Sequence, residues 1–192
     1  MPELLFAVES IEAEQRSVSP QLAVRLCVIN ADPSTQVRSI SLDAQVRIRA
    51  GIRENLYWTQ AACHVPPFNG SCIAKLLLHC SFDFNVAATR YFHRLPHGEV
   101  PLEFLFNGTV IYADASGTLR AEQVPWTKEA RYMLPVRVWQ DMMNHHYPDT
   151  VWLRLPRTVF ERLQRYRSDH GLPRWEQAVT ELLDERPVEA HR

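Results

Sequence analysis

Two segments in which apolar and polar residues alternate constrain the fold of this chain more than any other feature of its sequence. Residues 21–30 (QLAVRLCVIN) and 39–49 (SISLDAQVRIR) place an apolar side chain at every second position. Successive side chains of a β-strand point to opposite faces of a sheet, so a period of two predicts strands with one buried face. Turn-forming residues follow at 30–36 (NADPSTQ) and 51–56 (GIRENL). The pattern therefore predicts antiparallel strands joined by turns.

The expected fold class is α+β, mainly β. Strands and turns at this spacing predict an immunoglobulin-like antiparallel β-sandwich over residues 1–134. The chain has 192 residues, of which 46% are hydrophobic, and it can bury a core without disulfides or metals. From residue 135 helical patterns dominate, so we expect a small α-rich C-terminal subdomain over residues 135–185, packed on the sandwich. Residues 186–192 are expected to be a disordered tail.

The C-terminal region is predicted to contain three helices and a short strand. The first helix lies between Pro135 and Pro148, a position that suits proline at a helix start and just past its end. Its apolar stripe is predicted to consist of Val138, Trp139, Met142 and Met143. A short strand is expected over Val151–Leu155 (VWLRL). Two helices follow, and Gly171 separates them.

Residues 61–80 (AACHVPPFNGSCIAKLLLHC) contain three of the four cysteines and two of the eight histidines. This concentration of sulfur and imidazole raises the question of a metal site. We interpret the segment instead as a β-hairpin that carries core cysteines. A strand over residues 57–65 is followed by a proline-containing loop, and a strand over residues 72–84 returns.

The geometry of a strand argues against a metal ion here. Cys72 and Cys80 share the apolar face of the returning strand, and His79 lies on the other face. Eight strand residues span roughly 26 Å, so the two thiols cannot bind one ion. Cys63 and Cys72 flank the loop, and whether they form a disulfide stays open.

We predict no catalytic, cofactor-binding or metal-binding residue and no enzyme activity. The motifs G-x-S-x-G, G-x-x-x-x-G-K-[ST], G-x-G-x-x-G and H-E-x-x-H are absent from the sequence. Asp141 and His145 lie four residues apart on the helix that ends before Pro148, and His146 follows. A third ligand is not evident near them, so these residues are interpreted as structural.

Charge and hydropathy set the expected compartment and partner class. The net charge of −1 gives no reason to expect nucleic acid or an anionic membrane as partner. The N-terminal residues lack the basic and apolar regions of a signal peptide, and no apolar run is long enough to span a membrane. We therefore expect a cytoplasmic protein with reduced thiols.

Residues 65–110, 124–143 and 147–183 resemble an uncharacterised bacterial family, a domain of unknown function frequent in actinobacteria. The most specific phrase is P-W-x-K-E-A-x-Y-x-L-P-V-x-V-W, from Pro125 to Trp139. The family's genes are often found near those of actinobacterial-type nickel-iron hydrogenases, so the resemblance implies a cytosolic accessory, maturation or assembly role. The chain departs from the family at residues 51–60, where many members have a longer, arginine-rich connection.

The expected function is therefore non-catalytic binding of a protein partner, such as a hydrogenase subunit or maturation factor. The family phrase contains Trp126, Lys128 and Glu129, which are the first candidates for partner contact. Exposed aromatic residues are the next candidates, namely Tyr57, Trp58 and Phe68. The same aromatic side chains are equally suited to a core, and Lys128 and Glu129 are also interpreted as an ion pair at a strand start.

Two alternatives from other functional classes stay open. The strand-helix-helix order after residue 150 resembles a ribbon-helix-helix DNA-binding regulator, which predicts a two-fold dimer paired through Val151–Leu155. A metallochaperone predicts that His145, His146 or the cysteines bind metal. The partner, any ligand pocket and the oligomeric state, including a homodimer, are also left open by the sequence.

Overall fold

The computed structural model describes residues 2–49, 51, 55–81, 86–150 and 153–184. The chain divides into two compact units, Met1–Thr150 and Val151–Arg192. This division falls later than the expected boundary after residue 134, because the helix that follows Pro135 belongs to the first unit. The expected tail, residues 186–192, lies outside the described residues.

Within the described residues the chain is mainly β, with two antiparallel sheets and four helices, as the α+β class predicts. The elements in chain order are β1 (Leu4–Ala13), β2 (Gln21–Asn30), β3 (Gln36–Arg49), β4 (Asn55–Val65), β5 (Ser71–His79), α1 (Val86–His93), β6 (Glu99–Ala113), β7 (Leu119–Gln123), β8 (Glu129–Pro135), α2 (Val136–His146), α3 (Arg157–Asp169) and α4 (Trp175–Asp184).

The first sheet has the strand order β1-β2-β5, and the second has the order β4-β3-β6-β7. Strand β8 also pairs with β6, so β7 and β8 lie one after the other along the same edge of that strand. The chain moves from one sheet to the other between β2 and β3, between β4 and β5, and between β5 and β6. Consecutive strands therefore often belong to different sheets.

The alternating segments bury the faces that their sequences predict. In β2 the side chains of Leu22, Val24, Leu26 and Val28 are fully buried, and β3 buries its aliphatic positions in the same way. The ring of Phe6 in β1 stacks on that of Phe106 in β6 at 4.5 Å, so the two sheets share one core. Each fully buried aliphatic side chain stabilises the fold by about 1.5–3 kcal/mol.

The predicted hairpin around residues 61–80 is wrong. Strand β4 pairs with β3, whereas β5 pairs with β2 in the other sheet. The loop between them crosses from sheet to sheet, and the backbone N–H of Phe68 donates to the carbonyl of Val37 at 3.2 Å on the way. Alternation fixes which face of a strand is buried, but it does not fix the neighbouring strand.

The predicted faces of β5 are nevertheless confirmed for its described residues. Ala74, Leu76 and Leu78 are buried, and Cys80 just after the strand is buried too. His79 is exposed, as expected. Cys72 is half-buried and packs against the core. Phe82 and Phe84, at the end of the predicted strand, lie outside the described residues.

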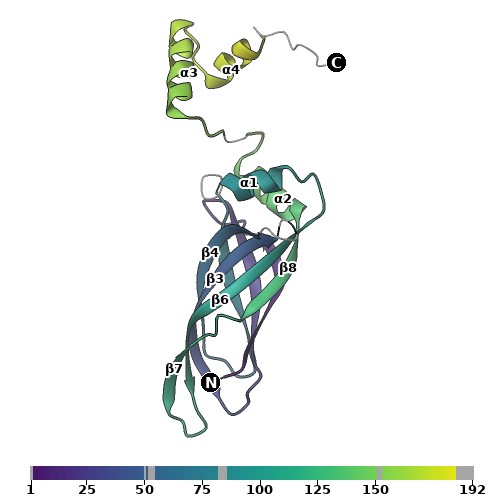
Figure 1. The fold of residues 1–192 in the computed structure, drawn as a ribbon, viewed down its shortest axis with the longest axis vertical. Coiled ribbons are helices and arrows are strands. Elements are labelled where there is room, and N and C mark those ends of the chain that lie inside the picture. Colours follow the sequence, from purple (N-terminus) through teal and green to yellow (C-terminus); the bar gives the residue numbers. More distant parts are fainter. Residues whose placement is uncertain (1, 50, 52–54, 82–85, 151–152, 185–192) are drawn as a thin grey trace. The chain divides into compact units, whose positions relative to one another are not determined.

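Helices α1 and α2 lie together at one end of the strands of the first unit, and β7 lies at the other end (Figure 1). Phe92 of α1 stacks on Trp139 of α2 at 4.9 Å and contacts Trp58 of β4 at 5.0 Å. Trp139, Met142 and Met143 are buried, so the apolar stripe predicted for this helix is confirmed. The aromatic cluster attaches both helices to the core of the sheets.

The second unit is a pair of helices, α3 and α4. The helix α3 ends in a Schellman motif, in which the N–H of Leu172 donates to the carbonyl of Arg167 at 3.0 Å. Gly171 has a φ of 64°, which confirms its role as the helix stop. The strand predicted for Val151–Leu155 is wrong at residues 153–155, which pair with no other strand. Residues 151 and 152 lie outside the described residues.

We predict that Gly108→Ala lowers the free energy of unfolding by about 2 kcal/mol or more. Gly108 has a φ of 140°, and an added Cβ would lie 2.0 Å from the backbone oxygen of Ser41 on the neighbouring strand. Urea unfolding measures the effect.

Gly117→Ala is the matched control for this substitution. Gly117 also has a positive φ, of 82°, but no heavy atom lies within 4 Å of the position that an added Cβ would take. Its substitution adds backbone strain without a clash and should cost about 1 kcal/mol. Equal losses in the two variants would contradict the close approach of β3 to Gly108.

Candidate functional site: the Pro125–Lys128 turn

The family phrase begins in a tight turn between two strands that share one edge. Strand β7 ends at Gln123 and β8 begins at Glu129, and both pair with β6. The N–H of Lys128 donates to the carbonyl of Pro125 at 3.0 Å and closes the turn. The turn therefore carries the chain along the edge of β6 without leaving the sheet.

Strand β6 holds this turn at both ends. The N–H of Val124 donates to the carbonyl of Gly108 at 2.9 Å, and the N–H of Phe106 donates to the carbonyl of Lys128 at 2.9 Å. The side chains of Val124 and Ala130, which flank the turn, are buried. Backbone bonds and buried neighbours on both sides fix the position of the turn.

Trp126 lies in the turn and points into solvent. Its relative exposure is 84%, the highest of any aromatic side chain in the described residues. Single exposed aliphatic residues are common on protein surfaces, but tryptophan is usually buried over most of its area. Packing within the described part of the first unit does not explain a tryptophan held in this way.

The charged residues of the phrase lie on the outer face of the second sheet. Glu129 is exposed and pairs with Arg131 at 3.1 Å, and no Lys128–Glu129 ion pair is found among the described residues. Oε1 of Glu103 also lies 3.9 Å from Nη2 of Arg131 and 3.9 Å from Nη1 of Arg49. The row of alternating charges extends from the turn across the sheet. The Glu129–Arg131 pair is exposed and stabilises the protein by about 0–1 kcal/mol, whereas Glu103 is buried.

The remaining aromatic candidates do not join Trp126 at one site. Trp58 and Phe68 are 3% and 8% exposed, so they are core residues in this structure, the second of the two roles predicted for them. Tyr57 is partly exposed, but it lies on β4. Strands β3 and β6 separate β4 from β8, which places Tyr57 about 14 Å from that edge at roughly 4.8 Å per strand. Trp126 is the one predicted aromatic residue that is well exposed.

The β6–β7 hairpin next to the turn was not predicted as part of a site. Leu119 is exposed on β7, which lies at the edge of its sheet, and Ile111 is partly exposed on β6. Asp114 accepts hydrogen bonds from Ser116 and Arg120 at the hairpin end, and these bonds lower the pKa of its carboxyl group. Strand β7 has only five residues, so the alternation of its sequence does not indicate which of its faces is exposed to solvent.

The histidines of α2 do not form a metal site with other described residues. His145 and His146 lie in the last turn of the helix, with ring centroids 5.3 Å apart. Burial, and then the neighbouring His145, lowers the pKa of His146. Among residues 2–49, 51, 55–81, 86–150 and 153–184, no three His, Cys, Asp or Glu side chains are grouped to hold a metal ion.

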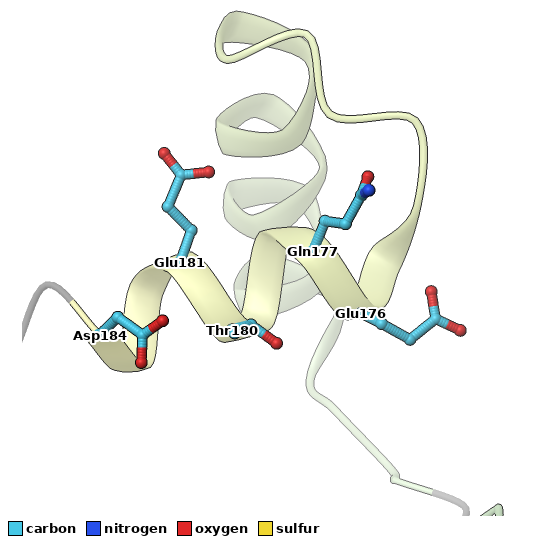
Figure 2. Close-up of a pocket in the computed structure, with 5 residues that line it drawn as sticks. All are labelled: Glu176, Gln177, Thr180, Glu181 and Asp184. Carbon is cyan, nitrogen blue, oxygen red and sulfur yellow. The ribbon is translucent and has the colours of Figure 1, made fainter.

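Two surface hollows among the described residues are lined mainly by polar and charged side chains. One hollow of about 580 Å³ is lined by Glu176, Gln177, Thr180, Glu181 and Asp184. All five side chains come from α4 (Figure 2). Another, of about 490 Å³, lies over β1, β2 and β5, where Lys75 pairs with Glu14. Both hollows are open. Three carboxylates line the first, and side chains of both charges line the second.

Comparison with protein families gives a match. Over residues 1–55 and 51–191 the chain is similar to the model of a protein family that is described as a family of unknown function (DUF6084). No curated protein matches the chain. Among the described residues, no helix has both the length and the apolar character needed to cross a bilayer. The expected link with hydrogenase genes stays a prediction.

We predict that Cys80 is alkylated far more slowly than Cys72 in the folded protein at pH 8. Cys80 is 4% exposed, and burial raises the pKa of its thiol to about 12. The reactive thiolate is therefore rare, and the reagent cannot reach it. Peptide mapping after a timed iodoacetamide pulse measures both rates.

The same experiment tests the pairing of Cys63 with Cys72. All four cysteines are free in the structure, so all four should react in guanidinium without a reductant. If two cysteines of the denatured protein react with iodoacetamide only after reduction, they form a disulfide. Equal rates at Cys72 and Cys80 in the folded state would contradict the burial of Cys80.

Proposed function

Since this chain belongs to the family of unknown function DUF6084, we propose its role from its own geometry. It is a non-catalytic protein that binds a partner protein through the Pro125–Lys128 turn. The exposed indole of Trp126 carries this proposal. The turn displays the indole, and the hydrogen bonds to Gly108 and Phe106 hold it in place before a partner arrives.

The size of a tryptophan explains how one residue can dominate an interface. Burial of an indole removes some 150–250 Å² from water, a gross gain of roughly 4–6 kcal/mol at about 25 cal/mol per Å². The loss of translational and rotational freedom on association offsets part of this gain. A fixed turn keeps the further cost of ordering the site small. Tryptophan is accordingly enriched at the energetic centres of interfaces.

The charges around the turn indicate what the partner surface contains. Lys128, Glu129 and Arg131 follow Trp126 closely in the chain, so a fitting partner has an apolar pocket with a polar rim that carries both signs of charge. We propose that this partner is a subunit or maturation factor of a nickel-iron hydrogenase and that binding occurs in the cytosol. This identity is supported by the sequence resemblance to the family.

For the fold, we propose an immunoglobulin-like β-sandwich. With the strands lettered A to G in chain order, an immunoglobulin constant domain has A, B, E and D in one sheet and C, F and G in the other. Here β1, β2 and β5 form one sheet, and β3 and β6 pair in the other. The fourth strand pairs with the third instead of joining the first sheet, and the last strand position is divided between β7 and β8.

We predict that Trp126→Ala weakens partner binding roughly tenfold or more, because truncation removes the proposed anchor. Tagged wild-type and variant proteins are expressed in the native host, and co-purified proteins are quantified by mass spectrometry. The partner is a protein whose recovery depends on Trp126, and its affinity is then measured with purified components.

Leu5→Ala is the matched control, since Leu5 is a partly exposed apolar residue on β1 in the other sheet. It should leave recovery unchanged. The proposed site would be refuted if the Trp126→Ala variant recovered every co-purified protein in the same amount as the wild type. If a partner depends on Trp126 but is unrelated to hydrogenases, the proposed binding site is supported and the proposed identity of the partner is wrong.

A further inference from the structure

The two-helix unit buries very little of its own apolar surface. Ala178 is the single buried residue among residues 153–184, and α3 has none. The helices contact each other mainly around Trp175, whose ring lies 5.2 Å from that of Phe160. The guanidinium of Arg167 lies over the same indole at 4.0 Å. These contacts orient the helices but do not form a core.

Apolar side chains follow a helical stripe on each helix and remain partly open to solvent. On α3, Val159 and Phe160 are more than 40% exposed. On α4, Val179 is 41% and Leu183 is 68% exposed, one turn apart. In a globular protein such a stripe faces a core. Here the described contacts of the unit leave both stripes uncovered.

A unit of this size needs a further source of stability. Domains of about 40 residues usually depend on disulfides, metals or association. The last cysteine of the chain is Cys80, so a disulfide within Val151–Arg192 is excluded. The described residues contain no group that could hold a metal ion. Association with a second copy of the unit is one way to cover the two stripes.

The charges of the two helices make the unit complementary to itself. Helix α3 carries four arginines and two carboxylates, whereas α4 carries three carboxylates and no basic residue. The acidic residues Glu176, Glu181 and Asp184 border the open hollow on α4 (Figure 2). A basic helix fits beside this surface. In a two-fold pair, α3 of each copy lies against α4 of the other, and the same contact forms twice.

We propose that the α3–α4 unit is a self-association surface, where two copies of this chain pair through their apolar stripes. Leu183 and Val179 of one copy pack against Val159 and Phe160 of the other, and the arginines of α3 face the carboxylates of α4. This surface differs from the Trp126 turn, which lies in the first unit. Pairing therefore does not depend on the proposed partner binding, and it presents two Trp126 turns in each assembly.

Sedimentation velocity of the full chain over a concentration series tests the proposal. The wild type should reach twice the chain mass of 22.3 kDa. The double variant Val179→Lys, Leu183→Lys should remain a monomer, with a dimer dissociation constant raised at least about tenfold. Both residues are exposed, and circular dichroism verifies that the variant keeps its helices. The exposed residue Leu5 in the first unit provides the control, because Leu5→Lys should leave the dimer intact.

A charge-reversal pair tests which helices meet. Arg157→Glu with Arg162→Glu reverses charges on α3, and Glu181→Arg with Asp184→Arg reverses charges on α4. Each variant alone should have a dimer dissociation constant at least about tenfold higher than that of the wild type. An equimolar mixture should form more dimer than either variant by itself, because both α3–α4 contacts of the mixed dimer join opposite charges. One contact pairs the two reversed helices, and the other pairs the two native helices.

Three results would overturn the proposal. The first is a wild type that keeps the mass of one chain at every concentration, which would mean that the stripes are covered in another way. The second is a Val179→Lys, Leu183→Lys variant that dimerises like the wild type, which would place the interface elsewhere. The third is a mixture of charge-reversal variants with no added dimer, which would reject the α3–α4 pairing. Loss of partner capture by Trp126→Ala with an unchanged dimer would bear on partner binding alone.

Discussion

The shared inner face of two sheets is the constraint on which the first unit depends. Strands β2 and β3 each bury one complete face, and the contact of Phe6 with Phe106 joins the sheets across the core. The connections that cross between sheets run along this core, so Phe68 becomes buried in a loop. The aromatic cluster around Trp139 extends the same core to α1 and α2. These packed side chains hold the surface turns in fixed positions.

The Trp126 turn lies next to the point where β6 changes its strand partner. At Gly108, strand β6 approaches Ser41 of β3 so closely that a side chain cannot fit. On either side of this position β6 changes partner, from β8 before it to β7 after it. The short turn between those two strands lies at the edge of the sheet, and Trp126 lies in it. The pairing of three strands thus fixes the place of the turn that carries the exposed indole.

The helices after residue 134 differ in what they pack against. The stripe of α2 is buried with the first unit, because Trp139 and Met142 extend its core. The stripes of α3 and α4 have no such core within their own unit. A similar amphipathic pattern therefore leads to an intramolecular contact in one case and, in our proposal, to an intermolecular one in the other. The amount of apolar surface that neighbouring elements supply decides between these outcomes.

The sequence by itself determined the local structure. Alternation predicted the buried faces of β2, β3 and β5, and the spacing of Trp139 and Met142 predicted α2, because side-chain direction depends only on local backbone geometry. The tertiary structure alone decided which strands pair, and it placed β4 and β5 in different sheets. It also separated Trp58 in the core from Trp126 in solvent. Burial of an aromatic residue depends on neighbours that are distant in the chain, which local patterns do not specify.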